Sequence, residues 1–198
     1  MFFEHAKIVF YMAWRFFLWI IRFKKKVVRK QRKSNFKPQE IIMKLSFKEG
    51  DWVDFNTWTS EFGVSGQSGI NVSNANNVIV CVSRENGDGV PYKDRWYSHA
   101  QWDGVCFTGQ GLEGDQTLTK SNKRLKQDKQ AYFFRKKKGD SRYLYCGVFV
   151  LVEESRNPNP RPELQDDING SRRNVWMFNM KYIHNRYPEK LAQAMKNF

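Results

Sequence analysis

From Met43 onward, short apolar runs alternate with clusters of turn residues. Runs rich in Val, Ile, Phe, Tyr and Trp are typical of β-strands, and clusters of Gly, Asn, Asp or Pro mark turns. The pattern therefore predicts a β-rich domain with few helices. The predicted strands are 51–55, 77–83, 104–108, 131–135, 143–153 and 174–183, with turns at 63–69, 86–89, 138–140 and 156–170.

Two segments have helical spacing instead. Residues 115–129 place Leu118 and Leu125 on one face, with lysines and an arginine elsewhere. Residues 188–198 begin with a proline, which the first turn of a helix tolerates, and then repeat apolar residues at helical spacing. Many short strands with one or two helices predict a β-rich α+β fold, a twisted sheet that closes into a barrel.

The N-terminal segment 1–42 differs from the rest of the chain. Residues 8–21 are apolar apart from Arg15, and a basic block, KKKVVRKQRK, follows them. The apolar run is shorter than the roughly 20 residues of a membrane span, and the layout is not that of a secretory signal. Three interpretations fit: an interfacial helix in which residues 8–33 contact a membrane surface, an atypical anchor, or a leader outside the working protein, which would then start at Met43. We therefore expect a leader at 1–42 and one domain at 43–198.

The positive charge of the protein is unevenly distributed along the chain. The 198 residues carry a formal net charge of +14, but the eleven Lys and Arg of the leader account for most of it. The domain itself is only mildly basic. Its three cysteines lie in apolar strand-like runs without CxxC spacing, which predicts reduced core thiols in a cytoplasmic protein rather than a disulfide or a zinc site.

The sequence offers little enzymatic chemistry. The three histidines, His5, His99 and His184, are scattered and fit no metal or HNH spacing. No GxSxG, phosphate-binding loop or dinucleotide motif occurs. Glu113 and Asp115 lack the Glu-x-Lys strand that usually accompanies metal-dependent nucleases. We therefore predict no catalytic residue, no metal and no cofactor, and expect a binding function.

A candidate ligand site lies between residues 90 and 125. There an apolar strand leads into a loop with glycines at 109, 111 and 114, followed by a basic helix. A flipped nucleobase requires aromatic faces and a carboxylate or amide at its Watson–Crick edge, and an Asp suits the amino group of cytosine. The basic helix suits phosphates. Equally, the aromatic residues fit a barrel core and the lysines a solvated surface. The aromatic candidates are Tyr92, Trp96, Trp102 and Phe107, and the polar ones are Asp94, Thr108 and Gln110.

The segment FTGQGLEGDQTLTKSNKRL resembles the SRA (SET- and RING-associated, or YDG) domain, a PUA-like barrel that reads modified cytosine by base flipping. The Asp-Gln-x-Leu-Thr-x-x-Asn-x-x-Leu pattern of that family is matched by Asp115, Gln116, Leu118, Thr119, Asn122 and Leu125. Downstream, RYLYCG at 142–147 resembles the Arg-Tyr-x-Tyr-Asp-Gly strand of the family. The similarity covers 64–183, and the compact loop is most similar to SRA-like domains of bacterial modification-dependent HNH endonucleases.

The resemblance implies a role for each site residue. Phe107 and Tyr92 would stack on the two faces of the flipped base, and Asp94 would bind the cytosine edge. Thr108, Gly109 and Gln110 would line the pocket. Three departures stand out: Phe107 lacks the hydroxyl of the usual tyrosine, Cys146 replaces the aspartate of the family pattern, and the loop 109–114 is too short for the DNA-probing finger of eukaryotic members.

The expected function is therefore a DNA-binding module that recognises 5-methyl- or 5-hydroxymethylcytosine in double-stranded DNA by base flipping. It would be the targeting part of a modification-dependent restriction system, working with a nuclease subunit that this sequence does not encode. Lys120, Lys123 and Arg124 are expected to bind phosphates. The alternatives are a PUA-like binder of RNA or phosphorothioate DNA without base flipping, and a membrane-anchored protein with a ligand-binding barrel.

Overall fold

The computed structural model describes residues 43–85, 92–153 and 158–198. These residues belong to one compact unit, Met43–Phe198. The interpretations of segment 1–42, including membrane contact through residues 8–33, and the turn at 86–89 lie outside the described residues. Within the described ranges, no helix is long and apolar enough to cross a membrane.

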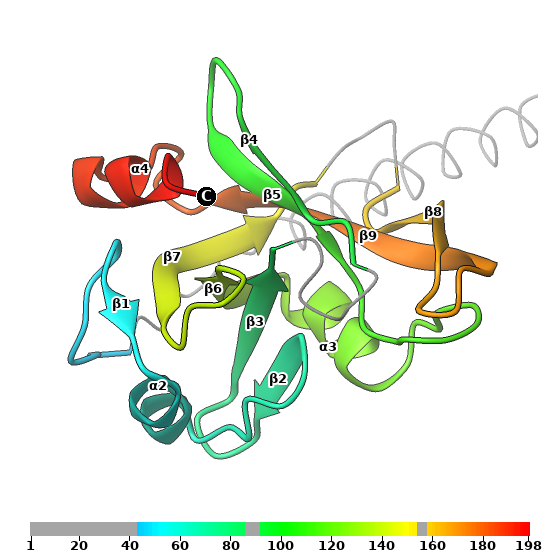
Figure 1. The fold of residues 1–198 in the computed structure, drawn as a ribbon, viewed down its shortest axis with the longest axis horizontal. Helices are drawn as coiled ribbons and strands as arrows, with labels where there is room; N and C mark the ends of the chain where they lie inside the picture. Colours follow the sequence, from blue (N-terminus) through cyan, green and yellow to red (C-terminus); the bar gives the residue numbers. More distant parts are fainter. Residues whose placement is uncertain (1–42, 86–91, 154–157) are drawn as a thin grey trace, which may run out of the picture. The chain divides into compact units, whose positions relative to one another are not determined.

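The described strands form one mixed sheet in the order β2-β3-β6-β7-β9-β5-β4, with β1 added beside β7 and β8 beside β9 (Figure 1). Only β3 and β6 pair in parallel, and the other neighbours are antiparallel. The strands are β1 (Trp52–Val53), β2 (Ile70–Ser73), β3 (Val78–Arg84), β4 (Arg95–Ser98), β5 (Asp103–Thr108), β6 (Gln130–Lys136), β7 (Tyr143–Leu151), β8 (Arg161–Asp166) and β9 (Arg172–Tyr182).

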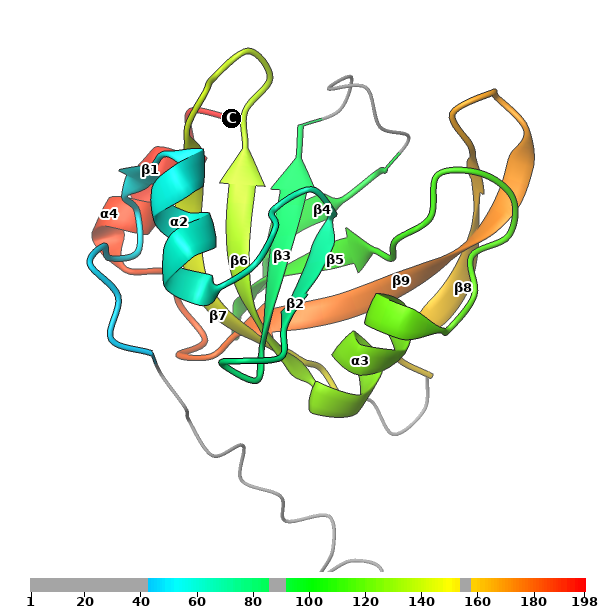
Figure 2. The same ribbon diagram turned by 90° about the horizontal axis from the view of Figure 1, so that it is seen from below.

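Within the described ranges, three helices accompany the sheet: α2 (Phe55–Phe62), α3 (Lys120–Asp128) and α4 (Glu189–Met195). Asp54 begins α2 because its carboxylate accepts a hydrogen bond from the Thr57 amide at 2.9 Å, and Gly63 ends it in the left-handed conformation. Helix α2 lies over the β6 and β7 side of the sheet, whereas α3 contacts β2 (Figure 2).

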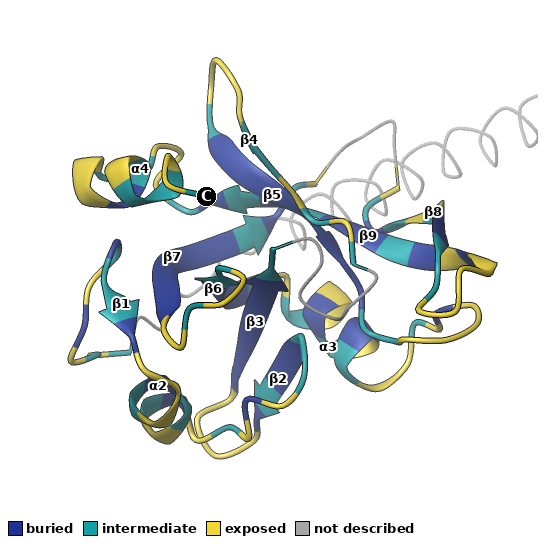
Figure 3. Ribbon diagram, in the orientation of Figure 1, coloured by how far each residue is buried: buried dark blue, intermediate teal, exposed yellow. Residues whose placement is uncertain are grey.

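The sheet is buried on both faces around β3 and β6. In β3, Ile79 and Cys81 face one apolar cluster, which includes Phe107 and Phe133, and the alternate residues Val80 and Val82 face a second cluster beneath α2. Burial on both faces explains why the β3 sequence is a continuous apolar run rather than an alternating one. Figure 3 shows β3, β5 and most of β7 as buried.

The structure confirms the β-rich α+β class and differs from the predicted elements in detail. Helix α2 and strands β2, β4 and β8 were not predicted, and β8 lies within the Pro/Asn segment interpreted as a turn. The predicted strand 51–55 is cut short because Asp54 caps a helix. The predicted helix 115–129 begins only at Lys120.

The sheet curls, but within the described residues no main-chain hydrogen bonds join its two end strands. Among the described strands, β2 and β4 are the two ends of the hydrogen-bonded path. A side-chain hydrogen bond reaches across this opening, from the Trp96 indole N–H of β4 to the Ser83 hydroxyl of β3 at 3.0 Å. Side chains therefore connect the two sides of this opening at the place where the candidate site residues gather.

Candidate functional site

Asp94 occupies the centre of the candidate site. Antiparallel pairing of β4 with β5 places Arg95 opposite Cys106, which brings the preceding Asp94 beside the end of β5. There the Thr108 amide donates a hydrogen bond of 2.7 Å to Asp94 Oδ1. The Ser83 hydroxyl is a further polar neighbour of the carboxylate. The structure thus brings the predicted Asp94 and Thr108 together and adds Ser83, which the sequence analysis did not select.

The environment of Asp94 changes its ionisation. Burial raises the pKa of this carboxyl group to about 6, because the charged form loses hydration. The Thr108 amide, the Ser83 and Thr108 hydroxyls and the positive charge of Arg135 oppose that shift and lower the pKa less strongly. At neutral pH the group is therefore mainly an ionised acceptor in surroundings of low polarity, where a suitable donor would be bound strongly.

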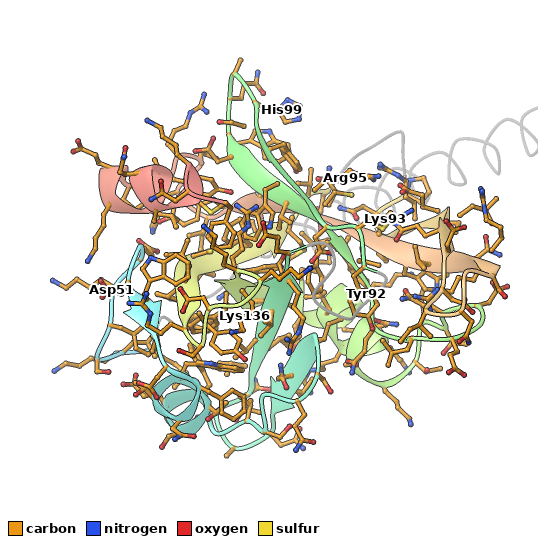
Figure 4. The ribbon with its side chains drawn as sticks, viewed as in Figure 1. Asp51, Tyr92, Lys93, Arg95, His99 and Lys136 are labelled. Carbon is orange, nitrogen blue, oxygen red and sulfur yellow. The ribbon has the colours of Figure 1, made fainter. Side chains whose placement is uncertain are left out.

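Tyr92 lies beside the loop that follows β5 (Figure 4), and the charge of Asp94 acts on its phenol. Its phenol oxygen accepts a hydrogen bond from the Gly111 amide at 3.2 Å. Burial raises the pKa of this phenol, and the Gly111 hydrogen bond and the charge of Arg173 partly offset the increase. The side chain is only half-buried, so its ring remains available to a ligand.

Phe107 and Thr108 end β5, and each is 2% exposed. The Phe107 ring packs edge-on against Phe133, with centroids 5.2 Å apart, inside the main apolar cluster. Another planar group can stack on Phe107 only if its neighbours move. The Thr108 hydroxyl is buried beside Asp94, close enough to act on its charge, but among the described residues no partner has the geometry of a hydrogen bond to it. An unsatisfied buried hydroxyl is unfavourable, and a ligand at this position could satisfy it.

Every backbone amide and carbonyl of the loop from Gly109 to Gly111 forms a hydrogen bond with another part of the protein. The Gly109 amide donates to the Trp176 carbonyl at 2.6 Å, and the Gly109 carbonyl accepts from Gln116 Nε2 at 2.6 Å. A Cβ at position 109 would lie 2.9–3.0 Å from three oxygen atoms, which explains why a glycine is required. The Gln110 side chain accepts a hydrogen bond from the Ser121 hydroxyl. Gly109 and Gln110 therefore shape the loop, and their backbone groups are already occupied.

Arg173 of β9 lies buried beneath the same loop. It is 2% exposed, and its Nη1 donates to the carbonyl oxygens of Gly111 at 2.7 Å and Gly114 at 3.4 Å. Its Nε and Nη2 atoms have no hydrogen-bond partner. The charge of Arg173 lowers the pKa values of Asp115 and Asp167, although hydrogen bonds to backbone amides are the larger cause at both. Arg173 thus links the loop to β9.

The three predicted phosphate-binding residues lie on α3. Lys120 and Lys123 are exposed. Arg124 is engaged within the protein, where it pairs with Asp128 at 2.6 Å and hydrogen bonds Asn77. Lys126 of the same helix is exposed as well, so three lysines of α3 present cationic groups that form no ion pair with a described carboxylate.

The structure separates the two tryptophans considered for the site. Trp96 lies near Asp94 through its bond to Ser83, whereas Trp102 packs against Tyr97 and His99 at the opposite end of β5. Arg173 was missed by the sequence analysis, although a signal existed. In β9 it shares the alternate positions of Val175 and Met177, which are buried.

Comparisons with known proteins identify the fold. The family described as "ScoMcrA-like, SRA domain" matches residues 52–197. A search of the curated proteins found no match. Among solved structures, the sulfur binding domain and SRA domain of ScoMcrA complexed with phosphorothioated DNA is 18% identical, with a TM-score of 0.53, over 77% of this chain and 46% of that one.

Two further solved structures have the same fold. The type IV phosphorothioation-dependent restriction endonuclease ScoMcrA is 18% identical, with a TM-score of 0.53, over 77% of this chain and 30% of that one. The DNA modification-dependent restriction endonuclease AspBHI is 13% identical, with a TM-score of 0.50, over 72% of each chain. The present chain therefore spans less than half of the ScoMcrA chains it matches. Within the ranges that the structure describes, no group of His, Cys, Asp or Glu could hold a metal ion.

Proposed function

The chain belongs to the ScoMcrA-like SRA domain family, and on that premise we propose that it is a DNA-binding module that recognises modified cytosine by base flipping. The modification would be 5-methyl- or 5-hydroxymethylcytosine. The observation that carries this proposal is the carboxylate of Asp94, half-buried at the end of β5 and fixed by the Thr108 amide at 2.7 Å. A half-buried ionised acceptor of this kind matches the amino group of cytosine.

The surrounding groups support the same ligand. A carboxylate has about four lone-pair sites, so the Thr108 amide and the Ser83 hydroxyl leave room for a base edge. The unpartnered Thr108 hydroxyl offers a further polar contact. Tyr92 supplies a half-buried ring for stacking, and Phe107 would become a second ring once its neighbours make room. Gly109 and Gln110 would line the site through the shape of their loop.

We place the DNA backbone near α3, where Lys120 and Lys123 are exposed, with Arg124 held by Asp128 as a weaker contributor. The matched structures are of restriction endonucleases. We therefore propose that this chain is the targeting part of a modification-dependent restriction system. The cleavage chemistry would belong to a nuclease partner, because the described residues contain no metal-ligand cluster.

A second candidate is the recognition of phosphorothioate DNA without base flipping. It is favoured by the similarity to a ScoMcrA structure that contains phosphorothioated DNA. That structure also contains a sulfur binding domain, so its ligand does not by itself assign a role to the SRA fold. The two candidates differ in their dependence on Asp94, since a backbone sulfur makes no use of a carboxylate at the base edge.

The test is a binding panel with four duplexes of one sequence, carrying cytosine, 5-methylcytosine, 5-hydroxymethylcytosine or a phosphorothioate. The wild-type chain should prefer a modified cytosine, and Asp94→Ala should remove that preference while weak salt-dependent binding remains. Asp128→Ala, which removes one carboxylate from α3, is the control and should keep the preference. Equal binding of all cytosine forms by the wild type would refute base reading. A preference for the phosphorothioate that survives Asp94→Ala would favour the second candidate.

A further inference from the structure

The turn between β6 and β7 is strongly basic. Between positions 135 and 142 the sequence RKKKGDSR has five Lys and Arg against one Asp. Parallel pairing of β3 with β6 aligns Ser83 with Arg135 and Arg84 with Lys136. The turn therefore leaves the sheet at the end where Ser83 approaches Asp94, and Figure 2 shows the arrowheads of β3 and β6 at this same end.

Aromatic rings position several of these cations. The Arg135 guanidinium lies 3.9 Å from the ring centroid of Phe198 and 5.4 Å from that of Trp96. The Lys136 ammonium lies 4.8 Å from the Tyr143 ring centroid, at the end of β6 (Figure 4). A ring face orients a cation but carries no net charge, so these contacts leave the positive charge uncompensated.

Carboxylates do not neutralise the three lysines of the turn. Among the described residues, ion pairs tie Arg95 to Glu163 at 2.7 Å and Arg124 to Asp128 at 2.6 Å, but no described carboxylate lies within ion-pair distance of the ammonium groups at positions 136–138. Two acidic groups lie nearby. Asp140 pairs with Arg142 at 3.3 Å, and Glu85 accepts a hydrogen bond from the backbone amide of Lys138. Lys137 donates to the Asn197 carbonyl.

We propose that the side chains of Lys136, Lys137 and Lys138 form a phosphate-binding surface for the DNA backbone beside the Asp94 site. This inference deepens the proposed function and rests on it. A lysine ammonium is a compact charge that binds phosphate oxygens without requiring a fixed orientation. The surface lies at the end of the sheet that holds Asp94, so one duplex can contact both. It adds to α3 a second set of backbone contacts.

The test measures DNA affinity of the full chain against salt concentration, from about 50 to about 200 mM, for a 5-methylcytosine duplex and its unmodified counterpart. The test variant is Lys136→Gln/Lys138→Gln. A matched control, Lys44→Gln/Lys48→Gln, removes the same charge from exposed lysines outside both α3 and the β6–β7 turn. Each lost phosphate contact lowers the slope of log affinity against log salt by about 0.9, so the test variant should lose about 1 to 2.

The ratio of modified to unmodified affinity should stay the same in the test variant, because phosphates carry no base identity. Thermal unfolding of both variants establishes that they fold. A slope equal to that of the control would overturn the proposal, and so would a selective loss of the modified duplex. If the wild type shows no preference for modified cytosine but the slope still falls in the test variant, the phosphate surface stands and the proposed base reading fails.

Discussion

The side chain of Asn122 hydrogen bonds both backbone polar groups of Gln110. Its Oδ1 accepts from the Gln110 amide at 2.7 Å, and its Nδ2 donates to the Gln110 carbonyl at 2.9 Å. This arrangement imitates the pairing of a neighbouring β-strand, and it fastens the loop after β5 to the first turn of α3. Asn122 is itself buried, so its amide has no alternative partner in water.

Replacing Asn122 should therefore destabilise the protein. Asn122→Ala leaves the amide and carbonyl of Gln110 without partners, at a cost of about 2–3 kcal/mol in the free energy of unfolding. Urea denaturation measures this loss. Gln127→Ala, on the exposed side of the same helix, is the control and should change stability by less than about 0.5 kcal/mol. Equal losses of stability in the two variants would show that the hydrogen bonds from Asn122 to Gln110 do not stabilise the protein.

The pKa of Asp94 predicts a pH dependence of stability. Burial raises the pKa in the folded state to about 6, above the ordinary value of 3.8, so the folded state binds the proton more tightly than the unfolded state. The resulting stabilisation is present below pH 3.8 and is lost as the pH rises to about 6, by about 3 kcal/mol at most.

The comparison that isolates this effect is wild type against Asp94→Asn, whose side chain does not titrate. The difference in free energy of unfolding, wild type minus variant, should fall between about pH 4 and pH 6 and level off above about pH 7. The exposed Glu113→Gln variant should show no such fall. A difference that is constant with pH would show that the pKa of Asp94 is not raised by burial.

Replacing Thr108 should not destabilise the protein, in contrast to replacing Asn122. Because its buried hydroxyl makes no hydrogen bond, Thr108→Val should leave the free energy of unfolding unchanged or raise it by about 1 kcal/mol. Thr57→Val is the contrast, since the Thr57 hydroxyl bonds Asp54 at 2.6 Å, and its loss should lower stability. Chemical denaturation separates the two. A loss above about 1 kcal/mol for Thr108→Val would reveal a partner for the hydroxyl.

Arg173 should control the order of the loop 111–114. Arg173→Met removes the donor that holds the Gly111 and Gly114 carbonyls, while a methionine fills much of the same buried volume. A protease specific for glutamate should then cut at the exposed Glu113 about tenfold faster, which corresponds to about 1.4 kcal/mol less free energy of local opening. Mass spectrometry identifies the site of cleavage.

The neighbouring Arg172→Met variant is the control for Arg173. Arg172 is exposed, and its ion-pair partner among the described residues is Asp166, at 3.6 Å, so cleavage at Glu113 should keep its wild-type rate. Arg173→Lys retains one charged donor and should give an intermediate rate. Cleavage that is equally fast in the wild type and in Arg173→Met would show that the other contacts suffice to hold the loop.

Part of the fold could be read from local patterns, and part could not. Strands β3 and β7 could be predicted from their long apolar runs, because strands that are buried on both faces are apolar along their whole length. Strand β8 was hidden because it is an added strand beside β9, with exposed Pro162 and Leu164 in a segment rich in turn residues. Helix α2 was missed because the apolar run 51–55 was interpreted as a strand, although Asp54 caps a helix whose aromatic residues Phe55, Trp58 and Phe62 have helical spacing.

The sequence by itself determined the class of fold and the motif Asp115–Gln116–Asn122, and it identified Asp94 as a candidate, because these features depend on residues close together in the chain. The pairing of β4 with β5, which brings Asp94 to the Thr108 amide, came from the structure. Only the tertiary structure decided that Ser83 and Arg135 approach Asp94, that Phe107 is packed in the core and that Arg173 supports the loop from β9. Those contacts join residues far apart in the chain. They form because the sheet curls and brings distant strands together, and the curl depends on the twist and pairing of all the strands.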